Sequence, residues 1–149
     1  MAKTKILDKR QVSAGNAAVN GLFSGLLAGI LMGLYLVFAG LTAGRGVAVY
    51  LAYFGLGKAT TPLAGLMLHL AISGIYGLIF GTVCHAVGLD RLDSIPPWLV
   101  GLVFGLITWV LAEYLILPGI GSPLNRIPTM HFIAAHALFG LVLGIQQKP

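Results

Sequence analysis

This chain of 149 residues is 58% hydrophobic and only 9% charged, and its mean hydropathy is +0.95. Soluble domains carry about 25% charged residues, so the composition excludes an ordinary soluble domain and indicates an integral membrane protein. The net charge of +5 does not require a nucleic-acid partner, because the positive-inside rule accounts for it. At this length the spans and short connections need nearly every residue, so residues 1–149 are predicted to form one membrane domain.

The N-terminal residues 1–16 carry four basic side chains and one acidic side chain and are predicted to be a short cytoplasmic lead. The apolar segment that follows is longer than the roughly 7–15 residues of a signal-peptide core. We therefore expect an uncleaved first span over residues 17–38, long enough for a hydrocarbon core that needs about 20 residues.

A small residue recurs at every fourth position of this first span, at Ala17, Gly21, Gly25, Gly29 and Gly33. Glycine inside a helix costs about 0.8–1 kcal/mol relative to alanine in water, so the spacing needs a physical reason. Small residues let two helix backbones approach closely in lipid. The stripe predicts a helix-packing face, and because it carries no ionisable group we expect this span to be a purely structural wall.

The rest of the chain divides into three further spans and one short apolar segment. Residues 46–57 are too short to cross and are predicted to lie at the membrane interface or to form a re-entrant hairpin. The later spans are predicted at 62–86, 97–117 and 129–145, with Pro118-Gly119 ending the third. The fold class is therefore an all-α membrane protein with a four-helix bundle.

Lysine and arginine are distributed unevenly between the predicted loops. Six of them fall on the side that holds both termini and three on the other side, so both termini are predicted to be cytoplasmic.

Glycine motifs recur along the chain. GLFSGL at 21–26 resembles GLVFGL at 101–106, and GLIFG at 77–81 resembles GLVLG at 140–144. This pattern favours two helical hairpins that are parallel repeats, although independent use of glycine and leucine would give the same motifs. The predicted helix-packing residues on the later spans are Gly77, Gly81, Gly101, Gly105, Gly140 and Gly144.

Ionisable residues inside a membrane are costly and indicate function by default. His69, Glu113 and His136 lie on the glycine-bearing faces of their spans, together with Trp109, and His131 lies near the start of the last span. His69 and His136 each lie roughly 12 Å from the outer end of their helices, at 1.5 Å per residue. The sequence therefore predicts a polar pocket, made by the last three spans, that faces outward.

Two interpretations of the histidines remain open. His69 and His136 could be axial ligands of haem b or a chlorophyll-type pigment, or each could hydrogen-bond to a neighbouring helix. His131 and Glu113 could form a proton relay or a rim metal site, or simply a hydrogen-bonded pair between two spans. A metal site is disfavoured because His131 and His136, five residues apart, point roughly 140° apart around a helix, and the single cysteine, Cys84, excludes a cysteine cluster.

The later spans carry a resemblance to small prokaryotic four-helix membrane proteins of the YagU-like, domain-of-unknown-function type. The residues that carry it, over most of the chain, are Gly101-x-x-x-Gly105-x-x-x-Trp109, Leu115-Ile116-Leu117-Pro118, His136-x-x-x-Gly140-x-x-x-Gly144 and His69 followed by Gly77-x-x-x-Gly81. The resemblance implies a multi-pass protein of the prokaryotic inner membrane without an assigned reaction. Glu113 does not match the pattern.

No phosphate-binding loop or serine–histidine protease motif is present in the sequence, so we expect no catalytic residues and no enzyme activity. The favoured function is a non-catalytic helix-packing or accessory subunit, without a cofactor, that associates with itself or with a larger membrane complex in the bilayer. The alternatives are a small transporter or proton-linked channel and an electron-transfer subunit with haem or pigment at His69 and His136.

Overall fold

The structure is a computed structural model that describes residues 13–56, 60–88 and 95–146. Within these ranges the chain folds into helices and turns and contains no strand. Most of the basic N-terminal lead lies outside the described residues, as do Lys58, Arg91 and Lys148, on which the predicted orientation partly depends. The elements in chain order are α1 (Ala14–Thr42), α2 (Val47–Tyr53), α3 (Pro62–Ala86), α4 (Pro97–Leu111), a π-helical turn (Ala112–Ile116), α5 (Leu117–Ile120), a 3-10 turn (Pro123–Arg126) and α6 (Thr129–Gln146).

Four of these helical segments are long and apolar enough to cross a membrane, which confirms the predicted all-helical, multi-pass architecture. They are Ala14–Thr42, Pro62–Ala86, Pro97–Ile120 and Thr129–Gln146. The first begins earlier than predicted because Ser13 caps it, accepting a hydrogen bond from the backbone N–H of Asn16 at 3.2 Å. The second begins at Pro62 as predicted, since Thr61 caps it and proline at the first helical position loses no hydrogen bond.

The predicted end of the third span at Pro118-Gly119 is wrong. The helix continues through both residues to Ile120 and ends at Gly121, whose φ of 60° is left-handed. Proline lacks the N–H of the helical ladder and clashes with the carbonyl one turn earlier. The π-helical turn directly before it, in which the N–H of Leu117 donates to the carbonyl of Ala112, widens the helix there.

The short segment after α1 forms α2, which packs back against α1 and α3. Two of the three aromatic residues in this segment are buried against neighbouring helices. Tyr50 is only 2% exposed, against Gly40 of α1, and Phe54 is 5% exposed, stacked on His69 with ring centroids 4.4 Å apart. Only Tyr53, which accepts a hydrogen bond from Arg45 at 3.0 Å, lies at the surface side of α2.

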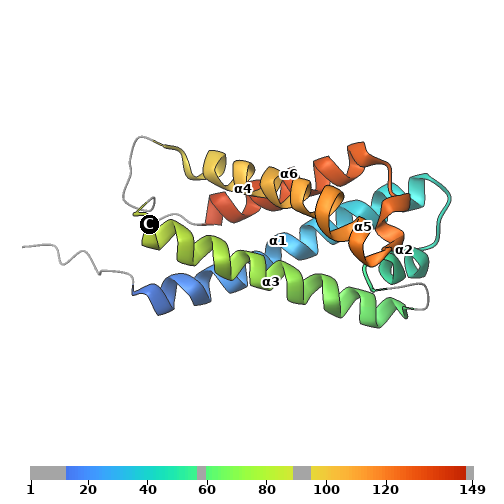
Figure 1. Cartoon of the computed structure of the whole chain (residues 1–149), viewed down its shortest axis with the longest axis horizontal. Coiled ribbons are helices and arrows are strands. Elements are labelled where there is room, and N and C mark those ends of the chain that lie inside the picture. The colour runs from blue at the N-terminus through green and yellow to red at the C-terminus, as the bar shows by residue number, and fades with distance from the viewer. Residues whose placement is uncertain (1–12, 57–59, 89–94, 147–149) are drawn as a thin grey trace, which may run out of the picture.

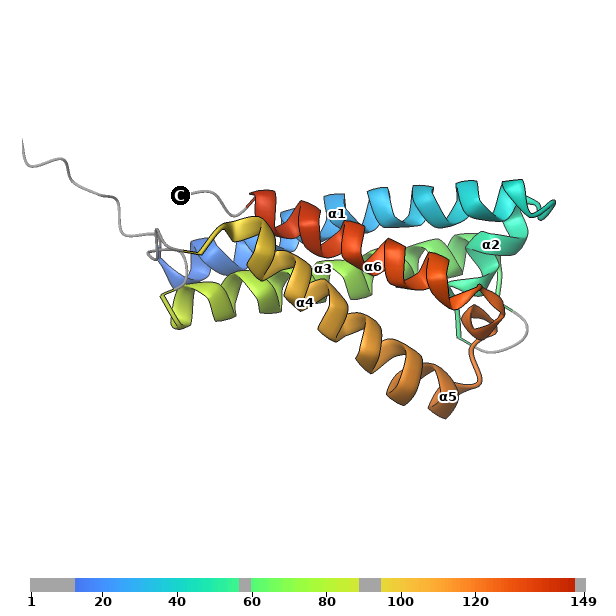
Figure 2. The ribbon, with the colours of Figure 1, turned by 90° about the horizontal axis from the view of Figure 1, so that it is seen from above.

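The spans form two helix pairs, α1 with α3 and α4 with α6, joined mainly through α1 and α6. Figure 1 shows that α1 begins and α6 ends at the same end of the bundle, here called the terminal end. The other end, called the distal end, carries α2 and α5. Figure 2 shows α4 running obliquely away from α1 and α3 toward the distal end, whereas α6 stays against α1 there, with His131 3.1 Å from Tyr35.

Both pairs are held by backbone contacts at glycine. A Cβ added at Gly25 would overlap Ser73 and Gly77 of α3, and one added at Gly105 would overlap the carbonyl of His136 on α6. The absence of side chains lets the two backbones touch in each pair, which is where helices in lipid gain dispersion energy. All ten predicted helix-packing glycines are buried: Gly21, Gly25, Gly29, Gly33, Gly77, Gly81, Gly101, Gly105, Gly140 and Gly144.

Candidate functional site

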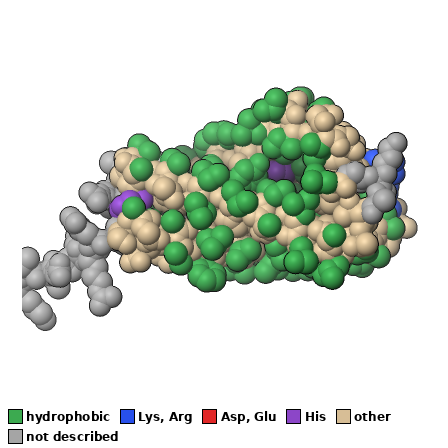
Figure 3. All heavy atoms as spheres, turned by 60° about the horizontal axis from the view of Figure 1, so that its bottom comes forward, with side chains coloured by type: hydrophobic (Ala, Val, Ile, Leu, Met, Phe, Trp, Pro, Cys, Tyr) green, Lys and Arg blue, Asp and Glu red, His purple; other side chains and the backbone are tan. Residues whose placement is uncertain are grey.

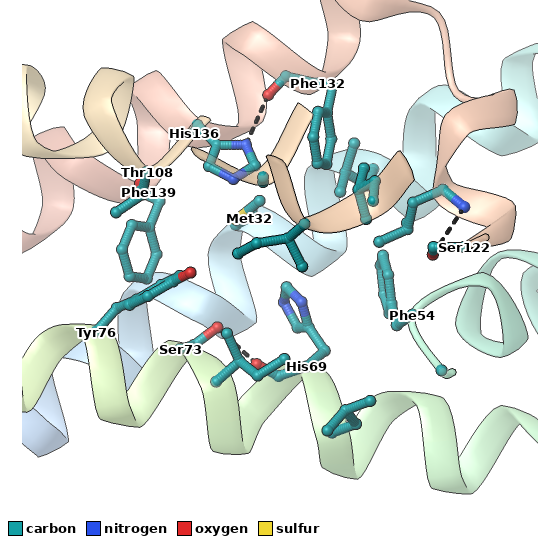
Figure 4. A pocket seen from close by; sticks show the side chains of 18 of the residues that line it. Met32, Phe54, His69, Ser73, Tyr76, Thr108, Ser122, Phe132, His136 and Phe139 are labelled. Carbon is teal, nitrogen blue, oxygen red and sulfur yellow. Dashed lines mark hydrogen bonds between the residues drawn. The ribbon is translucent and has the colours of Figure 1, made fainter. Parts of the chain in front are cut away.

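A cavity of about 120 Å³ lies where α4 diverges from α1 and α3. Its wall is mostly apolar, with His69, Ser73 and Tyr76 from α3 and His136 from α6 among the polar side chains. Figure 4 shows these side chains arranged around one space, with Met32 between the two histidines. The other lining residues are Leu36, Phe54, Gly55, Leu56, Leu68, Ile72, Thr108, Ala112, Ile116, Leu117, Ile120, Ser122, Leu124, Phe132 and Phe139.

The cavity opens on the flank of the bundle. Phe80 of α3 and Phe104 of α4 contact each other, with ring centroids 5.0 Å apart, and close the gap toward the terminal end. Farther along, Ile72 on α3 and Ile116 beside α5 both line the cavity and are 42% and 39% exposed. Figure 3 shows the hollow on a flank covered with hydrophobic side chains, with a histidine visible inside it. The opening therefore lies on an apolar flank of the bundle.

His69 is fixed between the first pair of helices. Its Nε2 lies 2.9 Å from the carbonyl oxygen of Gly29 on α1, and Gly29 has no side chain to block the approach. A carbonyl can only accept, so Nε2 donates and carries the proton of the neutral ring. The other nitrogen, Nδ1, is then a hydrogen-bond acceptor.

His136 has the opposite arrangement within α6. Its Nδ1 lies 2.9 Å from the carbonyl oxygen of Phe132, one turn earlier, so Nδ1 donates and Nε2 is the acceptor. The ring of Phe132 contacts the imidazole edge-on, with centroids 4.5 Å apart. The two histidines thus present different nitrogens, but both present an acceptor.

These acceptor nitrogens are not enclosed by the protein, and both histidines line the cavity. Within the described residues, Trp109 Nε1 is the one fully enclosed side-chain polar atom without a hydrogen-bond partner. His69 Nδ1, His136 Nε2 and the hydroxyl of Tyr76 also have no hydrogen-bond partner in the described protein. Since they are not among the enclosed atoms that lack a partner, each of them has some accessible surface. Because all three residues line the cavity, its space is the contact available to these atoms.

The other predicted pocket residues lie elsewhere. Glu113, His131 and Trp109 do not line the cavity. Nor do His131 and Glu113 bond to each other: His131 Nδ1 lies 3.1 Å from the hydroxyl of Tyr35 on α1, and Glu113 accepts a hydrogen bond from Thr129 at 3.4 Å. The hydrogen-bonded pair of His131 and Glu113, which was one of the interpretations, is therefore not formed, because His131 faces Tyr35 on α1.

The contact between Tyr35 and His131 gives a prediction for stability. We expect Tyr35→Phe and His131→Phe to be coupled by about 0.6 kcal/mol, the average for hydrogen bonds between membrane helices. A double-mutant cycle on the free energy of unfolding in detergent measures this coupling. The same cycle on His131 and Glu113 serves as the control and should give no coupling; the reverse pattern would contradict the observed pairing.

Several residues of the cavity were not predicted from the sequence. Tyr76 lies seven residues after His69, and Phe132 and Phe139 lie four before and three after His136, so helical spacing alone could have indicated them. Met32 and Leu36 of α1 had no such signal. Together with the Gly29 carbonyl that accepts from His69, they form the part of the cavity wall that the first span contributes.

A macrocycle ligand is a poor match to the cavity. Its volume is close to the roughly 150 Å³ of an engineered cavity that binds benzene, whereas a porphyrin is built of several rings of that size. Within the described residues no group of three histidine, cysteine or carboxylate side chains is placed to hold a metal ion. The volume of the cavity is therefore close to that of one aromatic ring.

Comparisons of this chain with protein-family models, with curated proteins and with solved structures find no match. The assignment of function therefore depends on the geometry of the cavity.

Proposed function

We propose that this protein binds a small apolar molecule from the bilayer, without catalysis, in the cavity between its two helix pairs. The observation that carries the proposal is the position of the opening, on the hydrophobic flank between α3 and α4. A molecule dissolved in the hydrocarbon can enter there without crossing water. Binding sites for small molecules are concave, mostly apolar and contain a few convergent polar groups, and this cavity has the same composition.

The proposal is tested by filling the cavity. Ile72→Trp adds bulk at the cavity wall on α3, whereas Ile75→Trp adds the same bulk on the same helix at a position that is 55% exposed and does not line this cavity. We expect an apolar compound to co-purify with the wild type and Ile75→Trp and to be at least tenfold depleted in Ile72→Trp. Solvent extraction and mass spectrometry measure it. Identical extracts from all three proteins would contradict the proposal.

The alternative functions give different results in the same preparation. Haem or pigment at His69 and His136 would give a strong visible absorbance that disappears on replacement of either histidine. A transporter or proton-linked channel would give flux in liposomes. The described cavity has no polar path toward the terminal end, where the glycine contacts close both helix pairs, and this favours binding over transport.

The proposal also includes the membrane location, the orientation and the assembly of the protein. We infer a location in the prokaryotic inner membrane, with both termini cytoplasmic, in accord with the lysine and arginine count and the YagU-like resemblance. The corresponding glycine contacts in α1–α3 and α4–α6 favour two repeated hairpins. An accessory role, through association with itself or with a larger membrane complex, is consistent with a protein that binds a ligand without converting it.

A further inference from the structure

We propose that the ligand of this cavity is a phenol or hydroquinone that carries an apolar chain, with its hydroxyl group donating to His69 or His136. The inference rests on the proposed function and specifies its ligand. It follows from three observations: the hydrogen-bonding character of the histidines, the size of the cavity and the position of its opening.

The histidines select a donor. Both imidazoles commit their N–H group to a backbone carbonyl, His69 to Gly29 and His136 to Phe132, each at 2.9 Å. Only acceptor nitrogens remain toward the cavity, His69 Nδ1 and His136 Nε2. A ligand that offered only a carbonyl or an ether oxygen would leave both nitrogens without a partner, and unmade hydrogen bonds in an apolar site are costly.

Tyr76 provides a further hydrogen-bonding group for the hydroxyl of the ligand. Its hydroxyl points into the space between α3 and α6 (Figure 4), and a hydroxyl can donate as well as accept. A ligand hydroxyl can therefore bond to a histidine acceptor or to the Tyr76 hydroxyl. An alkane can bond to neither group and a ketone only to Tyr76, whereas a hydroxyl can bond to both kinds of group.

The cavity limits the size of the head group. About 120 Å³ accommodates one aromatic ring, by comparison with the roughly 150 Å³ cavity that binds benzene. The walls are suited to a ring, since Phe54 stacks on His69 and Phe132 contacts His136 edge-on. A longer chain cannot fit inside and must leave through the opening beside Ile72 and Ile116, directly into the hydrocarbon.

The test compares two probes on the full-length protein purified in detergent. 4-Octylphenol and 4-octylanisole share the ring and the chain, but the methyl ether has no donor. Binding of tritiated 4-octylphenol, with 4-octylanisole as competitor, should show the phenol binding roughly tenfold more tightly, the equivalent of one neutral hydrogen bond. The double variant His69→Phe/His136→Phe should abolish this preference, and the control His131→Phe, a histidine outside the cavity, should retain it.

The outcomes separate this inference from the proposed function. Equal or tighter binding of the anisole to the wild type overturns the inference and leaves apolar binding in place; this comparison does not depend on the folding of any variant. A phenol preference that survives in a folded double variant also overturns it. If neither probe binds and Ile72→Trp changes no co-purifying compound, the proposed function itself is contradicted.

Discussion

Gly77→Leu is expected to prevent α1 and α3 from packing and to lower the free energy of unfolding by about 3 kcal/mol or more, the upper range for overpacking. A Cβ at Gly77 would overlap the carbonyl of Gly21 and the backbone of Gly25. Backbone atoms on both helices are fixed by helical hydrogen bonds, so no side chain can move aside. The helices would have to separate, and His69 would lose its hydrogen bond to Gly29.

The matched control is Ala71→Leu, which adds comparable bulk to the same helix at an exposed position. It should leave stability within about 0.5 kcal/mol of the wild type, as surface substitutions usually do. Titration with sodium dodecyl sulfate, followed by circular dichroism, gives the free energy of unfolding of both variants. Equal unfolding midpoints for Gly77→Leu and Ala71→Leu would contradict the close packing of α1 on α3.

Phe139→Ala is expected to destabilise the protein by about 3 kcal/mol, near the lower end of the range for buried phenylalanine. Phe139 is 2% exposed, lies in the core of the bundle and lines the cavity. In lipid the hydrophobic term is small, but the substitution still removes dispersion contacts and enlarges a space that the backbone cannot close.

Phe23→Ala provides the control, because Phe23 on α1 is 65% exposed to the bilayer side and lipid chains can replace its contacts. The two phenylalanines should therefore differ by about 3 kcal/mol in the same detergent titration. Similar losses in the free energy of unfolding for Phe139→Ala and Phe23→Ala would contradict the conclusion that packing of Phe139 in the core stabilises the bundle.

Sequence patterns and tertiary structure contribute differently to the helix boundaries. Thr61-Pro62 and the start of the last span are visible in the sequence because capping and proline rules act locally. The end of the third span is not visible in the sequence, because a π-helical turn accommodates Pro118 inside the helix. The burial of Tyr50 and Phe54 also depends on α2 folding back onto α1 and α3, a contact between segments that no local pattern specifies.

The site divides in the same way. The four-residue spacing places His69, Ser73 and the glycines on one face of a helix, and His136, Gly140 and Gly144 on one face of another, so these faces can be derived from helix geometry alone. The hydrogen-bond partner of each polar side chain cannot be derived from helix geometry. His131 bonds to Tyr35 rather than to Glu113 because the partner depends on how each helix is rotated against its neighbours.

The sequence by itself determined that the chain is a membrane protein of four helical spans, because length, apolar composition and the scarcity of charges allow no other way to satisfy the backbone in lipid. The glycine spacing defined the faces available for close packing. The tertiary structure decided which faces meet, and it separated α4 from α1 and α3 toward the distal end. That separation created a cavity with two histidine acceptors and an opening on the hydrocarbon flank, and it depends on helix crossing angles that the spacing of residues does not encode.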